Sequence, residues 1–155
     1  MMSLRDLLSV EDVFVDVHAR CKRGLLATLA EKAALSANVA ATVIEAALTE
    51  REQLGSTGVG NGVAIPHGKI DGLSDIKAFF FRLDAAIDFE AIDDEPVDLV
   101  VLLLAPSNAT AAHLKALAKV SRLMREASVR QALRGAETAE GILAITHQDQ
   151  HSNAA

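Results

Sequence analysis

The side chains best suited to chemistry lie in one glycine-rich stretch, REQLGSTGVGNGVAIPHGK, at residues 51–69. The stretch begins with Arg51, carries the hydroxyl residues Ser56 and Thr57, and has His67 near its end. Phosphoryl transfer needs a nucleophile, backbone N–H groups and hydroxyls around the phosphate, and a fixed cation. This combination favours phosphoryl transfer over a serine hydrolase, because Ser56 lies within a glycine loop and has no committed base.

The spacing of the glycines excludes two nucleotide-binding motifs. A Walker loop has four residues between its glycine and the Gly-Lys-Ser/Thr group, whereas five separate Gly62 from Gly68, and Ile70 occupies the hydroxyl position. A dinucleotide fingerprint that started at Gly58 would need a glycine where Val63 stands. We therefore expect no cofactor.

A second histidine, His113, lies in the first turn of a predicted helix that follows a long apolar strand. The positive end of a helix disfavours a protonated histidine and attracts anions. Ligands of open α/β sheets bind at the carboxyl ends of strands, and both His67 and His113 can reach such an edge. From placement alone, the alternative is structural: His67 fills a turn and His113 caps a helix.

The other histidines do not predict a metal site. His147 and His151 have the i, i+4 spacing of metal ligands on a helix, but they lack a third ligand. The acids nearest the end of the glycine-rich stretch, Asp71 and Asp75, have no ligand-like spacing to a histidine.

A histidine nucleophile needs an acceptor that keeps its proton on the other ring nitrogen, and we expect a backbone carbonyl in this role.

The secondary structure expected from the sequence must position the candidate site residues. Predicted strands alternate with predicted helices, and this order indicates a single α/β domain with a mixed sheet between helical layers. Predicted strands lie at 12–19, 76–83 and 97–105, and the last is apolar enough to be covered on both faces. We expect helices at 22–34, 128–136 and 137–146. Two further helices are expected to begin at N-caps: one starts from Asn38 and ends in the TERE segment, and the other starts from Thr110.

Apolar spacing also predicts which side chains face the core. In the first strand, Val13, Val15 and Val17 are expected on one face. In the helices, the expected buried residues are Leu25, Leu26, Leu29, Ala33, Val39, Val43, Ile44, Ala47, Leu48, Leu114, Leu117, Ala118, Leu123 and Met124.

Composition narrows the class of protein. The chain has 155 residues, 50% hydrophobic and 3% aromatic, and a net charge of −6 with scattered Lys and Arg. Few aromatic residues and no basic run argue against nucleic-acid binding. The single cysteine, Cys21, excludes an internal disulfide, and no apolar run approaches the ~20 residues of a membrane span. We expect a cytoplasmic protein that is not embedded in the membrane.

The pattern RE-x-x-GSTG-x-G-x-G-x-AIPHGK closely resembles the phosphorylated-histidine signature of the fructose/mannitol-type enzyme IIA proteins of the bacterial phosphotransferase system. The segment PVDLVVLLLAP, and HL at the next helix start, resemble the same family. The resemblance covers residues 4–146, the predicted domain, and leaves 147–155 as a predicted flexible tail. The chain is most similar to the nitrogen-regulatory branch of the family. The features that indicate this branch are the GNG segment, the AID-x-x-PVDL segment and the absence of a fused transporter domain.

The resemblance implies a role for each site residue. His67 would accept a phosphoryl group from a histidine-containing phosphocarrier protein, with His113 as its neighbour and Arg51 steadying the charge. The loop hydroxyls of Ser56 and Thr57, with the adjoining Gly58, would contact the phosphate.

Three functions follow from the resemblance and its alternatives. The first is a regulator in the nitrogen-related phosphotransfer chain, with a target such as a sensor kinase or a potassium transporter. The second is a sugar-branch enzyme IIA that passes phosphate to a separate IIB/IIC permease. The third, from another class, is a docking module that is not phosphorylated.

Overall fold

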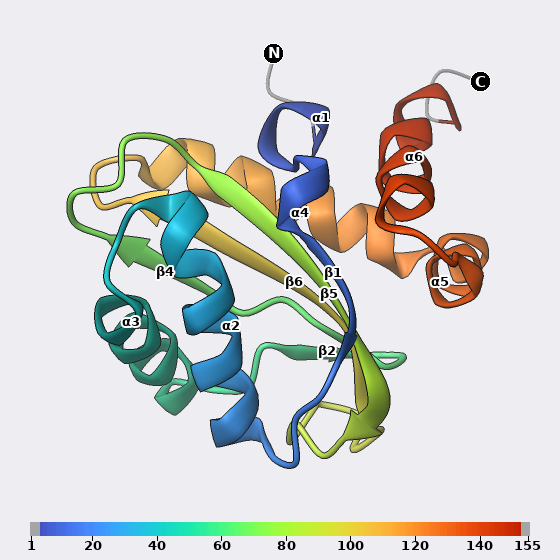
Figure 1. Ribbon diagram of the computed structural model, residues 1–155, viewed down its shortest axis with the longest axis horizontal. Coiled ribbons are helices and arrows are strands. Elements are labelled where there is room, and N and C mark those ends of the chain that lie inside the picture. Colours follow the sequence, from blue (N-terminus) through green and yellow to red (C-terminus); the bar gives the residue numbers. More distant parts are fainter. Residues whose placement is uncertain (1–3, 153–155) are drawn as a thin grey trace.

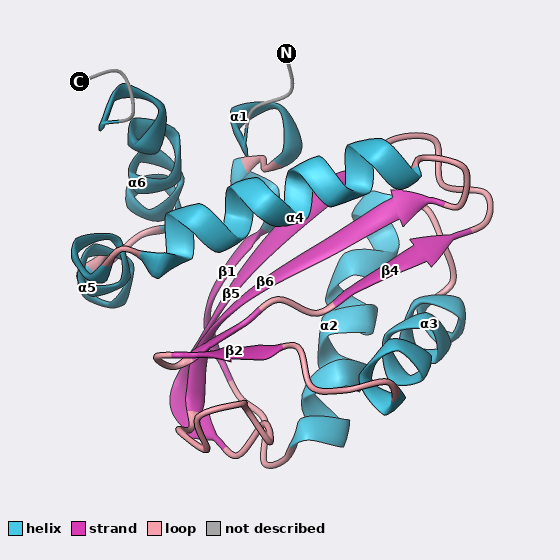
Figure 2. Cartoon of the chain, turned by 180° about the vertical axis from the view of Figure 1, so that it is seen from behind, coloured by secondary structure: helices cyan, strands magenta, loops and turns pink. Residues whose placement is uncertain are grey.

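A six-stranded mixed sheet forms the centre of the molecule, and helices cover both of its faces (Figures 1 and 2). The computed structural model describes residues 4–152. The strands are β1 (Val13–Val17), β2 (Gly58–Gly60), β3 (Val63–Ala64), β4 (His67–Ile70), β5 (Lys77–Ile87) and β6 (Val97–Pro106). Their order is β1-β5-β6-β3-β2, and β4 also pairs with β6. The mixed sheet between helical layers confirms the predicted fold class.

Strand β6 is the central element of the sheet. It runs antiparallel to β5 and parallel to both β3 and β4. Because β3 and β4 pair with successive parts of β6, the chain between them stays on the same edge of that strand. This pairing places His67, the first residue of β4, opposite Leu103 of β6.

The helices form two layers. They are α1 (Leu4–Leu7), α2 (Lys22–Ala37), α3 (Ala41–Gln53), α4 (Thr110–Arg125), α5 (Ala127–Gly135) and α6 (Ala139–Ser152), with a 3-10 turn at Val10–Asp12. Helices α2 and α3 share one core cluster with the sheet, while α1, α4, α5 and α6 share the other. Figure 1 shows these two groups on opposite sides of the strands.

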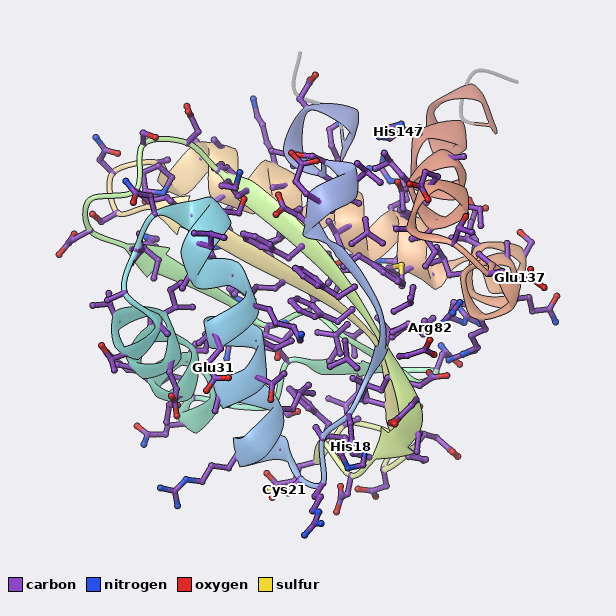
Figure 3. The ribbon with its side chains drawn as sticks, in the orientation of Figure 1. His18, Cys21, Glu31, Arg82, Glu137 and His147 are labelled. Atoms are coloured by element: carbon purple, nitrogen blue, oxygen red, sulfur yellow. The ribbon has the colours of Figure 1, made fainter. Side chains whose placement is uncertain are left out.

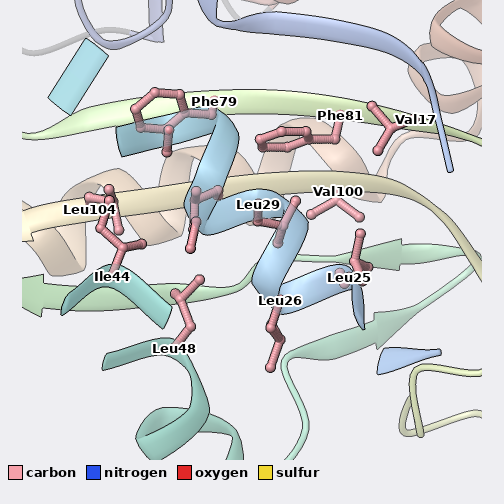
Figure 4. Close-up of a cluster of buried hydrophobic side chains, with 14 of the residues drawn as sticks. Val17, Leu25, Leu26, Leu29, Ile44, Leu48, Phe79, Phe81, Val100 and Leu104 are labelled. Atoms are coloured by element: carbon pink, nitrogen blue, oxygen red, sulfur yellow. The ribbon is translucent and has the colours of Figure 1, made fainter. Parts of the chain in front are cut away.

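Alternate side chains of β5 and β6 enter the two clusters. Phe79 and Phe81 pack against α2 and α3, and Phe80 packs on the opposite face. The same alternation in β6 sends Val100 and Leu104 toward α2 and α3 (Figure 4). Both faces of β6 are therefore buried, which confirms the interpretation of its apolar run.

The prediction that three valines share one face of β1 is wrong. Val13 and Val15 pack on the α4 side, whereas Val17 packs with Phe14 on the α2 side. Asp16 has a φ of 58°, and the pairing with β5 shifts between Phe14 and Val17. An extra residue in a strand reverses the side-chain alternation beyond it, and the short polar side chain of Asp tolerates this left-handed backbone.

Both predicted N-caps are also wrong. Asn38 ends α2 in the left-handed conformation, with φ 56° and ψ 44°, because Asn is one of the few residues that adopt it readily. Helix α3 begins at Ala41 after Ala40. Thr110 is the first residue of α4 rather than its cap.

The buried face of α4 is rotated from the one predicted. Leu123 and Met124 are buried as expected, but Leu114 is 63% exposed, and the helix buries His113 in the same stripe instead. Ala118, and Val43 on α3, are likewise exposed.

The last helix is longer than predicted. Helix α6 continues to Ser152, beyond the expected end at Thr146. Residues 153–155 of the predicted tail lie outside the described residues, and the flexibility of 147–155 stays a prediction. Within residues 4–152, none of the helices is both long and apolar enough to cross a bilayer.

Candidate functional site

A cavity of about 400 Å³ lies between α3, β4 and α4. Its lining includes Arg51 from the last turn of α3, His67 from the start of β4, and His113 from the first turn of α4. Figure 2 shows α3 beside β4. The structure thus brings together the three residues on which the predicted chemistry depends.

The two ring nitrogens of His67 have different partners. Nδ1 lies 2.9 Å from the carbonyl oxygen of Ile65, which can only accept, so Nδ1 carries the proton. Nε2 then has the free lone pair and accepts a hydrogen bond from Arg51 Nε at 3.2 Å. The acceptor for this proton is therefore a backbone carbonyl, as expected, and Nε2 is the ring nitrogen that carries no proton.

The chain around His67 explains this orientation. Pro66 keeps Ile65 in an extended conformation, and the Pro66 carbonyl accepts a hydrogen bond from Leu103 N–H at 3.0 Å, which ties the turn to β6. On the other side, a Cβ at Gly68 would lie 3.2 Å from Ala47 Cβ. Glycine therefore lets β4 pack closely on α3 at this position.

His113 is buried next to His67. It is 5% exposed, and the two rings meet edge to face with centroids 5.4 Å apart. Among the described residues, no group forms a hydrogen bond with His113 Nε2. Buried polar nitrogens normally have a hydrogen-bond partner. A ligand that bound in this cavity would supply the partner that His113 Nε2 lacks.

Burial keeps both histidines neutral. It lowers the pKa of His67, and the Arg51 charge lowers it further, while the hydrogen bond to Ile65 and the Glu52 charge act in the opposite direction. Burial also lowers the pKa of His113, with additional effects from His67 and Lys69. Neutral rings are what a nitrogen nucleophile requires.

These pKa shifts predict how stability depends on pH. The unfolded chain takes up protons at these two histidines at about pH 6.5, before the folded protein does, so the free energy of unfolding should fall as the pH falls below that value. The loss continues until the pH passes the lower folded pKa values. Urea unfolding between about pH 7.5 and about pH 5.5 should show a smaller loss for His113→Gln than for the unsubstituted protein. Equal losses would contradict the prediction.

Two cations lie at the cavity. Arg51 also donates from Nη1 to the carbonyl oxygen of Gly55 at 2.9 Å, which fixes the guanidinium beside His67. Lys69 Nζ donates to Thr110 Oγ1 at 3.0 Å. Lys69 was not among the predicted site residues, although its position two residues after His67 in a strand predicts the same side of the sheet.

The structure does not bring the predicted loop contacts to the cavity. Ser56 Oγ donates to the Phe89 carbonyl oxygen at 3.2 Å and accepts from Gly58 N–H at 3.0 Å. Thr57 is buried, and both its N–H and its hydroxyl donate to the Glu52 carboxylate. None of the three predicted residues lines the cavity, so their contact with phosphate stays a prediction that this geometry does not favour.

The glycines at 58–62 shape a β-hairpin rather than an open cradle. Strands β2 and β3 pair antiparallel across them, and a Cβ at Gly58 would lie 2.8 Å from both Cα and Cβ of Ala91. At Gly62, with φ 80°, a Cβ would lie 2.3 Å from Arg134 Nη2. The backbone is close to its own chain at these positions.

Gly58→Ala should therefore destabilise the fold by about 1–3 kcal/mol, because Ala91 presents backbone that cannot rotate away. Gly135→Ala is the matched control, since a Cβ there meets nothing within 4 Å in helix α5 and should change stability by less than about 1 kcal/mol. Urea unfolding of both variants measures the difference, and equal stability would contradict the packing argument.

The remaining histidines lie elsewhere. His18 and Cys21 lie at one end of the molecule and His147 at the other (Figure 3). His18 Nδ1 pairs with Asp84 Oδ2 at 3.2 Å, and the side chain of His151 lies outside those described. In the described part of the chain, no group of three or more His, Cys, Asp or Glu side chains could hold a metal ion.

The fold and the site together define an α/β protein with a neutral histidine pair and a fixed arginine at an open cavity. Residues 6–148 match the family described as phosphoenolpyruvate-dependent sugar phosphotransferase system, EIIA 2, and the chain belongs to this family. The match confirms the resemblance drawn from the sequence.

Relatives of known name are similar over nearly the whole chain. A nitrogen regulatory protein of Bradyrhizobium diazoefficiens is 44% identical over 144 residues, which cover 93% of this chain and 94% of the relative. One from Pseudomonas aeruginosa is 40% identical, with 94% and 95% covered. The crystal structure of nitrogen regulatory protein IIA-Ntr from Neisseria meningitidis superposes with a TM-score of 0.88 at 32% identity, covering 92% of this chain and 98% of that one.

Proposed function

We propose that this protein accepts a phosphoryl group on Nε2 of His67 from a phosphorylated histidine-containing carrier protein and acts as a regulator of the nitrogen-related phosphotransfer chain. The observation that carries the proposal is the arrangement of His67. Its proton is held on Nδ1 by the Ile65 carbonyl, and its free nitrogen meets the guanidinium of Arg51.

The transfer step needs no added reactant beyond the phosphorylated carrier. The lone pair of His67 Nε2 forms a bond to phosphorus, and the bond between phosphorus and the carrier's histidine nitrogen breaks. The carrier's ring keeps that electron pair and becomes neutral. The Nδ1 proton of His67 stays in its hydrogen bond to Ile65, which stabilises the positive ring of the product.

Three side chains around His67 are suited to the phosphoryl charge. We propose that the Arg51 guanidinium moves from Nε2 to the phosphoryl oxygens, because it carries several donors in a planar fork. His113 has a ring nitrogen without a partner among the described residues, and we propose that it donates to a phosphoryl oxygen. Lys69, at the cavity wall, adds a second positive charge.

The rim of the cavity is suited to a protein partner. Leu54 is 83% exposed and Leu114 is 63% exposed, and both line the cavity that contains His67. Exposed apolar side chains around a polar site are typical of an interaction surface. We propose that the carrier docks on these leucines and so brings its phosphohistidine to Nε2.

The regulatory role rests on the curated relatives, which are named nitrogen regulatory proteins. Phosphorylation would add about −1.5 to −2 charges to a chain whose net charge is −6. A change of this size next to the exposed leucines can alter which partner binds. The protein could therefore report the phosphorylation state of its carrier to a target such as a sensor kinase or a potassium transporter.

The intact mass of the protein tests the proposal. The protein is incubated with phosphoenolpyruvate, the first enzyme of the chain and the carrier at mildly alkaline pH, where phosphohistidine survives. We expect the mass of one phosphoryl group to appear and to be lost in acid. No change in mass in the presence of a demonstrably phosphorylated carrier would overturn the proposal and favour a docking module.

A further inference from the structure

We propose that Glu52 is a positioning residue for phosphoryl transfer. It orients Thr57, and through Thr57 and Ile65 it keeps the proton of His67 on Nδ1. The inference deepens the proposed function and rests on it for the transfer step, whereas the effect on the histidine ring can be measured independently.

Glu52 connects several segments of the chain through one nearly buried carboxylate. Its side chain is 6% exposed. Oε1 accepts from Thr57 N–H at 3.0 Å and pairs with Lys22 Nζ at 2.9 Å, and Oε2 accepts from the Thr57 hydroxyl. Helix α3 is thereby joined to the glycine-rich stretch and to the first residue of α2.

The connection continues from Thr57 to the nucleophile. The Thr57 carbonyl accepts a hydrogen bond from Ile65 N–H at 2.9 Å, and the Ile65 carbonyl lies 2.9 Å from His67 Nδ1. The backbone group that selects the tautomer of His67 therefore belongs to a residue whose own N–H is bound by Thr57. If Thr57 shifted, the Ile65 carbonyl would shift with it.

Adjacent residues at the end of α3 thus act on opposite nitrogens of His67. Arg51 contacts Nε2 directly, and Glu52 acts on Nδ1 through two other residues. Their charges also have opposite effects, because Arg51 lowers the pKa of His67 and Glu52 raises it. One helix thus supplies both a cation and an anion that act on the same ring.

Lys22 supplies an ion-pair partner for this buried carboxylate. Its ammonium also lies 3.5 Å from Glu90 Oε1 and 4.8 Å from the centre of the Phe89 ring. A buried carboxylate without a partner would be costly. With three donors the Glu52 carboxylate is well satisfied, and such fully bonded groups rigidify their surroundings.

Two substitutions of Glu52 separate its geometry from its charge. Glu52→Ala removes every contact with Thr57, and we expect the rate of phosphoryl uptake from the carrier to fall by about 10- to 100-fold, as for other misaligned reacting groups. Glu52→Gln keeps an amide that can accept from Thr57 N–H and donate to its hydroxyl, so it should restore most of the rate. Glu45→Ala is the control, because it removes the same charge from α3 at a residue outside the site.

The ring of His67 supplies a readout that a merely structural role would not move. In ¹⁵N NMR spectra, Glu52→Ala should convert the single Nδ1–H tautomer of His67 into a mixture, whereas Glu52→Gln should retain it. Both variants should lower the pKa of His67, because both remove the charge that raises it. Glu45→Ala should retain the Nδ1–H tautomer.

A second pair of variants keeps the test decisive if Glu52→Ala does not fold. Thr57→Val removes the hydroxyl at nearly constant volume and should reduce uptake and mix the tautomers, while Thr57→Ser should resemble the unsubstituted protein. Unchanged tautomer and rate in both Glu52→Ala and Thr57→Val would overturn the inference. If the unsubstituted protein itself takes up no phosphoryl group, the proposed function fails, and the tautomer spectra still decide the role of Glu52.

Discussion

His67→Ala should take up no phosphoryl group from the phosphorylated carrier, even after prolonged incubation. The cavity contains one neutral ring nitrogen that is held with its lone pair toward a cation. The other histidine in the cavity, His113, is 5% exposed and would need to turn outward to react. We therefore expect the intact mass of the variant to stay unchanged under conditions that phosphorylate the unsubstituted protein fully.

His18→Ala is the matched control for this experiment. It removes an exposed histidine whose ring pairs with Asp84, outside the lining of the cavity. Its uptake should equal that of the unsubstituted protein. Acid-labile phosphate on His67→Ala would show that another nitrogen, with His113 the first to examine, is the acceptor.

Arg51→Ala should slow phosphoryl uptake by about 10²- to 10³-fold, the usual effect of removing one preorganised donor from a developing charge. A smaller opposing effect is expected, since the substitution also frees Nε2 from a hydrogen bond. A single hydrogen bond contributes a net ~1 kcal/mol, which is too little to offset the loss. Rapid-quench measurements with excess phosphorylated carrier give the rate of phosphoryl uptake.

Arg51→Lys and Arg20→Ala control for charge. A lysine at 51 restores the charge but cannot reproduce the planar fork that bonds both His67 and the Gly55 carbonyl, so it should recover only part of the rate. Arg20→Ala removes an exposed cation outside the cavity and should have little effect. A rate for Arg51→Ala within a few-fold of that of Arg20→Ala would contradict the proposed role.

Local features of the sequence were enough to predict the central strand of the fold and the family of the protein. The apolar run of β6 predicted a strand covered on both faces, and it is buried on both. The stretch at 51–69 predicted the family, which the comparison confirms. The resemblance also assigned Arg51 to the charge at His67, and the two side chains are in contact. These features depend on periodicity and on short spacings, which are properties of consecutive residues.

Other features were decided by the tertiary structure. The reversal of β1 at Asp16 depends on pairing with β5, and the exposure of Leu114 depends on which side of α4 meets the sheet. Propensity alone allows Asn38 to begin a helix or to end one, and the contacts of α2 select the second.

The site shows the same division most clearly. The sequence placed two hydroxyls, Ser56 and Thr57, beside a histidine nucleophile, and residue type alone suggested that they contact phosphate. The folded chain turns them toward Phe89 and Glu52 instead, because the hairpin that follows packs against Ala91. The Ser56 contact joins residues 33 positions apart, and the Thr57 contact depends on how the end of α3 packs against the loop that follows it. The sequence therefore determined the chemical parts of the site, and the tertiary structure decided which of them face the cavity and which support it.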